Sequence, residues 1–200
     1  MMAAAACVAL LTGPALAQIG APLQVQTGTT ARGSIIGAVL GGAPGSEIAS
    51  EMDVLARTLT RRLADRAKVD RVGEGIVVRL DSDSYFVGGS DQLSPAGRTS
   101  LGVLSGRLMH AEGAEVLIVG HTDSRGDARA NMGLSYRQAE AVEAALLAGD
   151  VPDERIRVEA RGAMEPVASN EEPAGRRANR RMEIAIFASE ARREAALARN

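Results

Sequence analysis

Apolar residues recur along the chain in two rhythms, which predict strands separated by helices. Short β-branched or continuous apolar runs indicate strands, and apolar positions three and four residues apart indicate helices. The expected strands are Gly75–Leu80, Glu115–Val119, Ile156–Ala160 and Met182–Phe187. Helices are expected over Ser46–Lys68, from Ser94-Pro95 onward and over Ala130–Ala148, with a loop over Asp81–Asp91 and a basic turn or short helix over Glu172–Arg181. The order β-α-β-α-β-(α)-β predicts an α/β (α+β) fold, a mixed sheet with helices packed on it.

The first helix has one apolar face. Its apolar residues are spaced by four, three, four and four positions, and they are Ile48, Met52, Leu55, Leu59 and Leu63. Arginines occupy the opposite face, and solvation explains them without a partner. We therefore expect an amphipathic helix over 46–71, the sheet domain over 72–187 and a charged, Ala-rich helical tail over 188–200.

The first 17 residues have the pattern of a secretory signal peptide. No charge precedes Arg32, and an Ala- and Leu-rich run ends in Ala15-Leu16-Ala17 before the polar Gln18. Two alternatives are a small apolar helix of the fold and lipidation at Cys7. The pattern therefore predicts that the protein is exported.

Residues 18–45 form a linker with a periodic glycine stripe. Glycines recur every fourth position at Gly33, Gly37, Gly41 and Gly45, with apolar residues between them. On a helix this spacing makes one stripe where backbones can approach closely. The apolar span is shorter than the roughly 20 residues of a membrane helix. A membrane-associated or self-packing segment over 33–45 and a flexible linker both remain open.

Composition excludes several classes of function. Apolar residues make up 46% and charged residues 24%, which is typical of a folded protein. With a net charge of -2 and 2% aromatic residues, we expect no nucleic-acid partner. One cysteine excludes an intrachain disulfide and a four-cysteine zinc site, and two histidines leave little for a metal centre. We expect neither a metal site nor a cofactor, and composition leaves the oligomeric state open.

Two separated motifs resemble the OmpA C-terminal domain family. The first is Gly120-His121-Thr122-Asp123-Ser124-Arg125-Gly126, followed by Asn131, Leu134-Ser135 and Ala139; the second is Gly175-Arg176, Asn179-Arg180-Arg181 and Glu183. Phe86, Ser90 and Leu93 fit the first loop of that family. The resemblance covers 72–187. It implies a location in the periplasm, with outer-membrane association as a further option. It also implies a domain that binds peptidoglycan without catalysis, through the diaminopimelate of the stem peptide, and so tethers an envelope component to the cell wall.

The candidate ligand residues follow from this resemblance and from the chemistry of diaminopimelate, whose free end is zwitterionic. Such a ligand needs an anion for its ammonium and hydrogen-bond donors for its carboxylate. Asp123 matches the acid of the family, and Thr122 and Asn131 can donate or accept beside it. An Asx turn or an ion pair with Arg125 is the structural alternative for Asp123, and capping of the next helix is the alternative for Asn131. Gly120 and Gly126 would let the loop approach the ligand closely.

One departure from the family lies in the helix after this loop. The family has an arginine three residues after its Leu-Ser pair, as a carboxylate clamp, and this chain has Gln138 there, with Arg137 one residue earlier. Glutamine forfeits a charge-assisted hydrogen bond of about 1.5–3 kcal/mol. The long side chain of Arg137 could still reach the ligand carboxylate, and Arg176 could partly replace the clamp. Structural roles are expected for Asn179 and Arg180.

Two other classes of function compete with a wall-binding domain. An enzyme would need His121, Asp123 and Asp127 as a metal or hydrolytic site, but no nucleophile elbow, P-loop or dinucleotide motif is present. His121 is instead expected to hydrogen-bond locally at its strand end. The other class is an envelope assembly protein with a weakened or idle peptidoglycan pocket.

Overall fold

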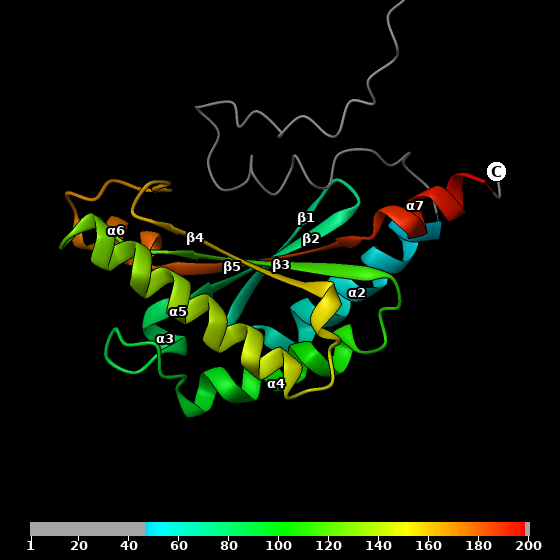
Figure 1. Cartoon of the computed structure of the whole chain (residues 1–200), viewed down its shortest axis with the longest axis horizontal. Coiled ribbons are helices and arrows are strands. Elements are labelled where there is room, and N and C mark those ends of the chain that lie inside the picture. The colour runs from blue at the N-terminus through cyan, green and yellow to red at the C-terminus, as the bar shows by residue number, and fades with distance from the viewer. Residues whose placement is uncertain (1–46, 199–200) are drawn as a thin grey trace, which may run out of the picture.

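The computed structural model describes residues 47–198, which form one sheet with helices on it (Figure 1). The helices are α2 (Glu47–Leu63), α3 (Ser82–Tyr85), α4 (Pro95–Leu108), α5 (Ala128–Leu147), α6 (Pro173–Asn179) and α7 (Glu190–Leu197). The strands are β1 (Ala67–Val72), β2 (Gly75–Asp81), β3 (Ala114–His121), β4 (Ile156–Gly162) and β5 (Arg181–Ala188), with a 3-10 turn at Asp153–Arg155. Side-chain oxygens cap α4 and α5, since Ser94 accepts from the Gly97 N–H and Asp127 accepts from the Ala130 N–H.

The sheet is mixed, with the strand order β1-β2-β5-β3-β4. Only β3 and β4 pair in parallel within the described chain, and α5 connects them. The last strand, β5, lies between β2 and β3 and is antiparallel to both. It is buried along its whole length, as expected for a central strand. The predicted mixed sheet with helices packed on it is therefore confirmed.

The main core lies between the sheet and the helices α2, α3, α4 and α5, which cover the same side of it (Figure 1). Strand residues that face the helices alternate with those facing away, as in Ile76, Val78 and Leu80 of β2. The buried residues of α2, among them Leu59 and Leu63, belong to this same core. The amphipathic helix is thus part of the folded unit that also holds the sheet.

Several predicted boundaries were wrong. The first helix ends at Leu63 instead of extending to 68 or 71, because 67–72 forms β1 and pairs with β2 across a turn at Gly73. The segment predicted as a loop after β2 contains the short helix α3. Helix α5 begins at Ala128, two residues before the predicted start, because Asp127 provides the cap. These segments are too short or too polar for hydrophobic periodicity to reveal them.

Other predictions concern residues outside the described range. The predicted signal peptide over 1–17, Cys7, and the predicted linker with its glycine stripe over 18–45 lie outside residues 47–198, as does Ser46 at the start of the first expected helix. Among the described helices, none combines the length and the apolar character that crossing a bilayer requires.

Candidate functional site

Three chain segments meet at one edge of the sheet. In the strand register, Asp81 at the end of β2 lies opposite Arg181 at the start of β5, and Arg181 lies opposite His121 at the end of β3. Because β5 is antiparallel to both neighbours, its beginning coincides with their carboxyl ends. The residues just beyond these three positions, Asp83, Arg180 and Asp123, are thereby brought together.

Asp123 is held rigidly at this edge. It is 7% exposed, and its Oδ1 accepts a hydrogen bond of 2.9 Å from the Arg125 backbone N–H. That contact is the Asx turn considered as an alternative in the sequence. Its Oδ2 pairs with Nη1 of Arg180 at 2.6 Å. The ion-pair partner of Asp123 is therefore Arg180, and not Arg125.

Arg180 bridges two carboxylates. Its Nε and Nη2 donate to both oxygens of Asp83, at 2.7 and 2.6 Å, while Nη1 serves Asp123. The hydrogen bonds from Arg180 lower the pKa of the Asp83 carboxyl, and Asp83 with Asp123 raises the pKa of the guanidinium further above its usual range. The three side chains place two anions and one cation side by side in a partly exposed position.

Thr122 and Asn131 support the loop that carries Asp123. The Thr122 hydroxyl donates to the Asp123 carbonyl at 3.0 Å, and the Asn131 amide donates to the carbonyls of Asp123 and Arg125. Asp127, and not Asn131, caps the following helix. Gly126 has a φ of +89°, which an L side chain rarely adopts, so glycine is required in this turn. The side-chain hydrogen bonds of Thr122 and Asn131 thus fix the loop backbone.

Gln138 and Arg137 both hold the loop between α3 and α4. Gln138 is 3% exposed, and its Nε2 donates to the Ser90 carbonyl at 2.8 Å. Arg137 pairs with Asp91 through Nε at 2.9 Å. Phe86 and Leu93 close the same loop by a β-bridge. The position of the family's clamp is therefore occupied by a buried amide that is already hydrogen-bonded to this loop.

The residues of the second family motif support loops, and one of them also reaches the candidate site. Arg176 donates through Nη1 to the carbonyls of Asn170 and Glu171, so its guanidinium is committed to the loop before α6. Asn179 is fully buried and bonds the backbone of Val167 and Ala168. The support expected of Asn179 is confirmed. Arg180 also has the structural role expected of it, because it joins the segments that carry Asp83 and Asp123, and its guanidinium contacts Asp123 directly.

His121 does not make the local hydrogen bonds expected of it. It is 1% exposed, and neither ring nitrogen has a hydrogen-bond partner among residues 47–198. Burial, together with the positive charges of Arg181 and Arg161, lowers its pKa to about 3. Nor does any group of three or more potential metal-binding side chains occur in the part of the chain that the structure describes. Asp127, the third residue of the metal or hydrolytic site considered from the sequence, caps α5 by accepting from the Ala130 N–H.

Sequence reasoning did not identify Asp83 as a residue of this charged cluster. Asp83 lies in a segment whose polar composition indicated only a loop, 97 positions from the arginine it binds. The register of β2, β3 and β5 could have indicated that Asp83 and Arg180 meet, but it can be used only once the order of the strands is known.

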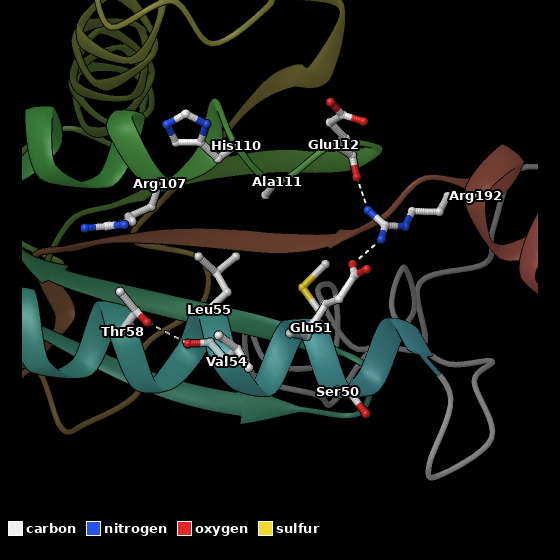
Figure 2. A pocket seen from close by; sticks show the side chains of 11 residues that line it. Ser50, Glu51, Val54, Leu55, Thr58, Arg107, His110, Ala111, Glu112 and Arg192 are labelled. Atoms are coloured by element: carbon white, nitrogen blue, oxygen red, sulfur yellow. Dashed lines mark hydrogen bonds and ion pairs between the residues drawn. The ribbon is translucent and has the colours of Figure 1, made fainter.

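A separate groove lies between α2, the end of α4 and α7, away from this edge (Figure 2). It has a volume of about 610 Å³ and an apolar wall that includes Leu55 and Ala111. Arg192 closes one end by binding the Glu112 carbonyl and the Glu51 carboxylate, as the dashed lines show. None of the predicted ligand residues lines this groove.

The fold and the charged edge define a class of small mixed-sheet domains with a polar site where β2, β3 and β5 meet. The chain belongs to the OmpA family, whose model matches residues 85–180. Probable lipoprotein YiaD of Escherichia coli K12 is 33% identical over 143 residues, which cover 71% of this chain and 65% of YiaD. Outer-membrane lipoprotein YfiB of Pseudomonas aeruginosa is 35% identical over 113 residues, covering 56% of this chain and 67% of YfiB.

Two further relatives bear on the cell wall. Peptidoglycan-binding protein ArfA of Mycobacterium tuberculosis H37Rv is 36% identical over 94 residues, covering 47% of this chain and 29% of ArfA. The solved structure of the cell wall anchor of the T6SS from Pseudomonas aeruginosa is 34% identical, with a TM-score of 0.59. That match covers 66% of this chain and 97% of the other. The chain thus spans a small part of ArfA, about two thirds of the two lipoproteins and nearly all of the anchor domain.

Proposed function

We propose that the protein binds peptidoglycan non-covalently through the diaminopimelate of the stem peptide, and so tethers an envelope component to the cell wall without catalysis. Membership of the OmpA family and the relatives named as a peptidoglycan-binding protein and a cell wall anchor support this function. The relatives named as a probable lipoprotein and as an outer-membrane lipoprotein support a place in the periplasm.

The pairing of Asp123 with Arg180 is the observation that carries the proposal. The free end of diaminopimelate presents an ammonium and a carboxylate on the same carbon, and these need an anion and a cation side by side. Asp123 and Arg180 offer that pair, with their charged atoms 2.6 Å apart. In this proposal Asp123 takes the ammonium and Arg180 takes the carboxylate.

Arg180 also supplies the positive charge that Gln138 lacks. Arg176 and Arg137, the candidate substitutes from the sequence, donate to the loops that hold them. Arg180 alone among the three touches Asp123. Because Asp83 already binds this guanidinium, a ligand carboxylate must compete with a carboxylate of the protein. We therefore expect weaker binding than in family members with the clamp arginine.

Co-sedimentation of the full chain with purified sacculi tests the proposal, with free diaminopimelate as competitor. Asp123→Asn should weaken binding at least tenfold, because it removes the anion for the ammonium. Asp127→Asn is the matched control: it removes a carboxylate from the same loop and leaves a residue that caps a helix equally well. Sacculi cross-linked through lysine in place of diaminopimelate should bind poorly.

The same experiment separates a second function, assembly in the envelope with an idle pocket. The ion pairs of Arg180 with Asp83 and Asp123 favour that alternative, since these three side chains already have partners without a ligand. If the folded wild-type protein does not bind sacculi that contain diaminopimelate, the peptidoglycan-binding proposal is wrong and envelope assembly is the function that remains.

A further inference from the structure

A hollow of about 660 Å³ adjoins the candidate site at Arg180. Its lining comes from the turn that joins α2 to β1, the start of β1, the end of β2 and helix α6. Arg180 lines it and also donates to Asp123, so this side chain is common to the hollow and the proposed diaminopimelate site. The α2–β1 turn and β2 precede the residues that match the family model, which begin at 85.

The lining of the hollow has more basic than acidic side chains. It includes six cationic side chains and two carboxylates, Asp65 and Asp81; the cations are Arg66, Lys68, Arg79, Arg177, Arg180 and Arg181. Clefts lined by one sign of charge attract ligands of the opposite sign. A ligand that enters this hollow is therefore expected to carry negative charge.

Two of these cations remain available. Arg79, Arg177, Arg180 and Arg181 each form a close pair with a carboxylate of the protein. Lys68 is 69% exposed and reaches Asp70 only at 3.9 Å, while the Arg66 guanidinium has no ion-pair partner among the described residues. Arg66 and Lys68 can thus bind a ligand carboxylate without breaking a close ion pair within the protein.

Apolar side chains contribute to the lining of the hollow beside the charged ones. They are four alanines, Leu80 and Val167; the alanines are Ala64, Ala67, Ala174 and Ala178. Such a mixed lining suits a ligand that carries both methyl groups and charged groups. The stem peptide of peptidoglycan has this character, since it is a short chain of alanines and a glutamate around the diaminopimelate, with free carboxylates.

We infer that this hollow is a second subsite for the stem peptide, in which Arg66 and Lys68 bind the carboxylates that neighbour the diaminopimelate held at Asp123. The inference rests on the proposed function and extends it from one residue of the ligand to the adjacent peptide. It assigns a ligand contact to the α2–β1 turn, which lies outside the matched family region.

Fluorescence polarisation with the full chain tests the subsite. The probes are a labelled muropeptide with free carboxylates and the same muropeptide with its glutamate and terminal carboxylates amidated. Arg66→Gln combined with Lys68→Gln should weaken binding of the free-carboxylate probe about tenfold at low salt, because two exposed ion pairs are lost. The amidated probe should bind this variant and the wild type equally.

Arg61→Gln combined with Arg62→Gln is the matched control. It removes the same charge from the same region of the chain, but these arginines line a different hollow with Thr58 and Arg107. Binding of both probes should be unchanged in this control. An equal loss in the two double variants would overturn the subsite, because it would reflect net charge alone.

Two further outcomes separate this inference from the proposed function. If Asp123→Asn abolishes muropeptide binding and the Arg66/Lys68 variant binds normally, the subsite is wrong and the proposed function stands. If the wild type binds neither sacculi nor muropeptides, both the subsite and the proposed function are wrong.

Binding to vesicles of anionic phosphatidylglycerol is the last measurement. If Arg66→Gln combined with Lys68→Gln abolishes vesicle binding but leaves muropeptide binding unchanged, the hollow binds a membrane surface and the subsite is wrong.

Discussion

Arg180 shows how a single guanidinium organises the site. Its planar set of donors serves the two oxygens of Asp83 on one edge and Asp123 on the other. A lysine could not hold both carboxylates in fixed directions, because its ammonium is a point charge on a flexible stem. At the residue scale, the proposed function therefore makes the affinity for a zwitterion depend on the competition between Asp83 and the ligand for this arginine.

His121 is the other unusual residue at this edge, and it makes stability depend on pH. Its pKa of about 3 in the folded protein lies below the value near 6.5 expected in the unfolded chain. Between these values the unfolded chain binds a proton that the folded protein does not bind. The free energy of unfolding must therefore fall as the pH is lowered from 6.5 toward 3.

We predict that His121→Phe removes this dependence. The wild type should lose up to about 1.4 kcal/mol per pH unit relative to the variant between pH 6 and 4. At pH 7.5 the variant should be as stable as the wild type or more so, since phenylalanine leaves no buried nitrogen unpaired. Urea unfolding at several pH values measures both effects. Parallel curves for the two proteins would contradict the assigned protonation state.

At the scale of elements, the close approach of β3 and α5 positions the Asp123 loop between them. A Cβ built on Gly120 would lie 2.2 Å from the Ser135 carbonyl oxygen, so only glycine fits. The expectation that Gly120 serves a close approach to the ligand was wrong, because the neighbour is helix α5. Ser135 joins the elements further, since its hydroxyl accepts from the Gly162 N–H of β4.

Gly120→Ala should therefore separate α5 from β3 and cost about 2–4 kcal/mol of stability, with loss of sacculus binding. Gly102→Ala is the matched control, because Gly102 lies inside α4 and nothing stands within 4 Å of the added Cβ. That change should stabilise the protein by about 0.5–1 kcal/mol. Thermal unfolding compares the two variants, and a harmless Gly120→Ala would show that α5 can shift without cost.

At the scale of the whole molecule, α2 is part of the folded unit. Leu59 is fully buried in the same core as the strands, and Arg192 of α7 binds Glu51 of α2. A helix that shares a core with the sheet should unfold together with it. The core therefore extends beyond the residues that match the family model.

Leu59→Ala should lower the stability of the whole domain by about 2–5 kcal/mol in one transition. Val54→Ala, at a half-exposed position of the same helix, should change it by less than about 0.5 kcal/mol. Hydrogen exchange reports whether the amides of β5 lose protection together with those of α2. If the amides of α2 lose protection before those of β5, this helix unfolds separately from the rest of the domain.

The elements with regular periodicity were predictable from the sequence. The four expected strands and the helices α4 and α5 are present, because each buries a face of constant period against a single core. Strand β1 escaped prediction because it is a half-exposed edge strand rich in charged residues, without a strong apolar pattern. Helix α3 is a single turn capped by Asp81, which is below the length that periodicity can detect.

The sequence by itself determined the mixed α/β architecture, the family motifs and the place of Asp123 in the loop after a buried strand. Only the tertiary structure decided which cation meets that carboxylate. Asp83, Arg180 and Asp123 come from separate segments, and their contact depends on β5 lying between β2 and β3 with its beginning at the ends of both. A local sequence pattern indicates how each residue is placed within its own helix or strand. Strand order and register, in contrast, determine which residues far apart in the chain become neighbours.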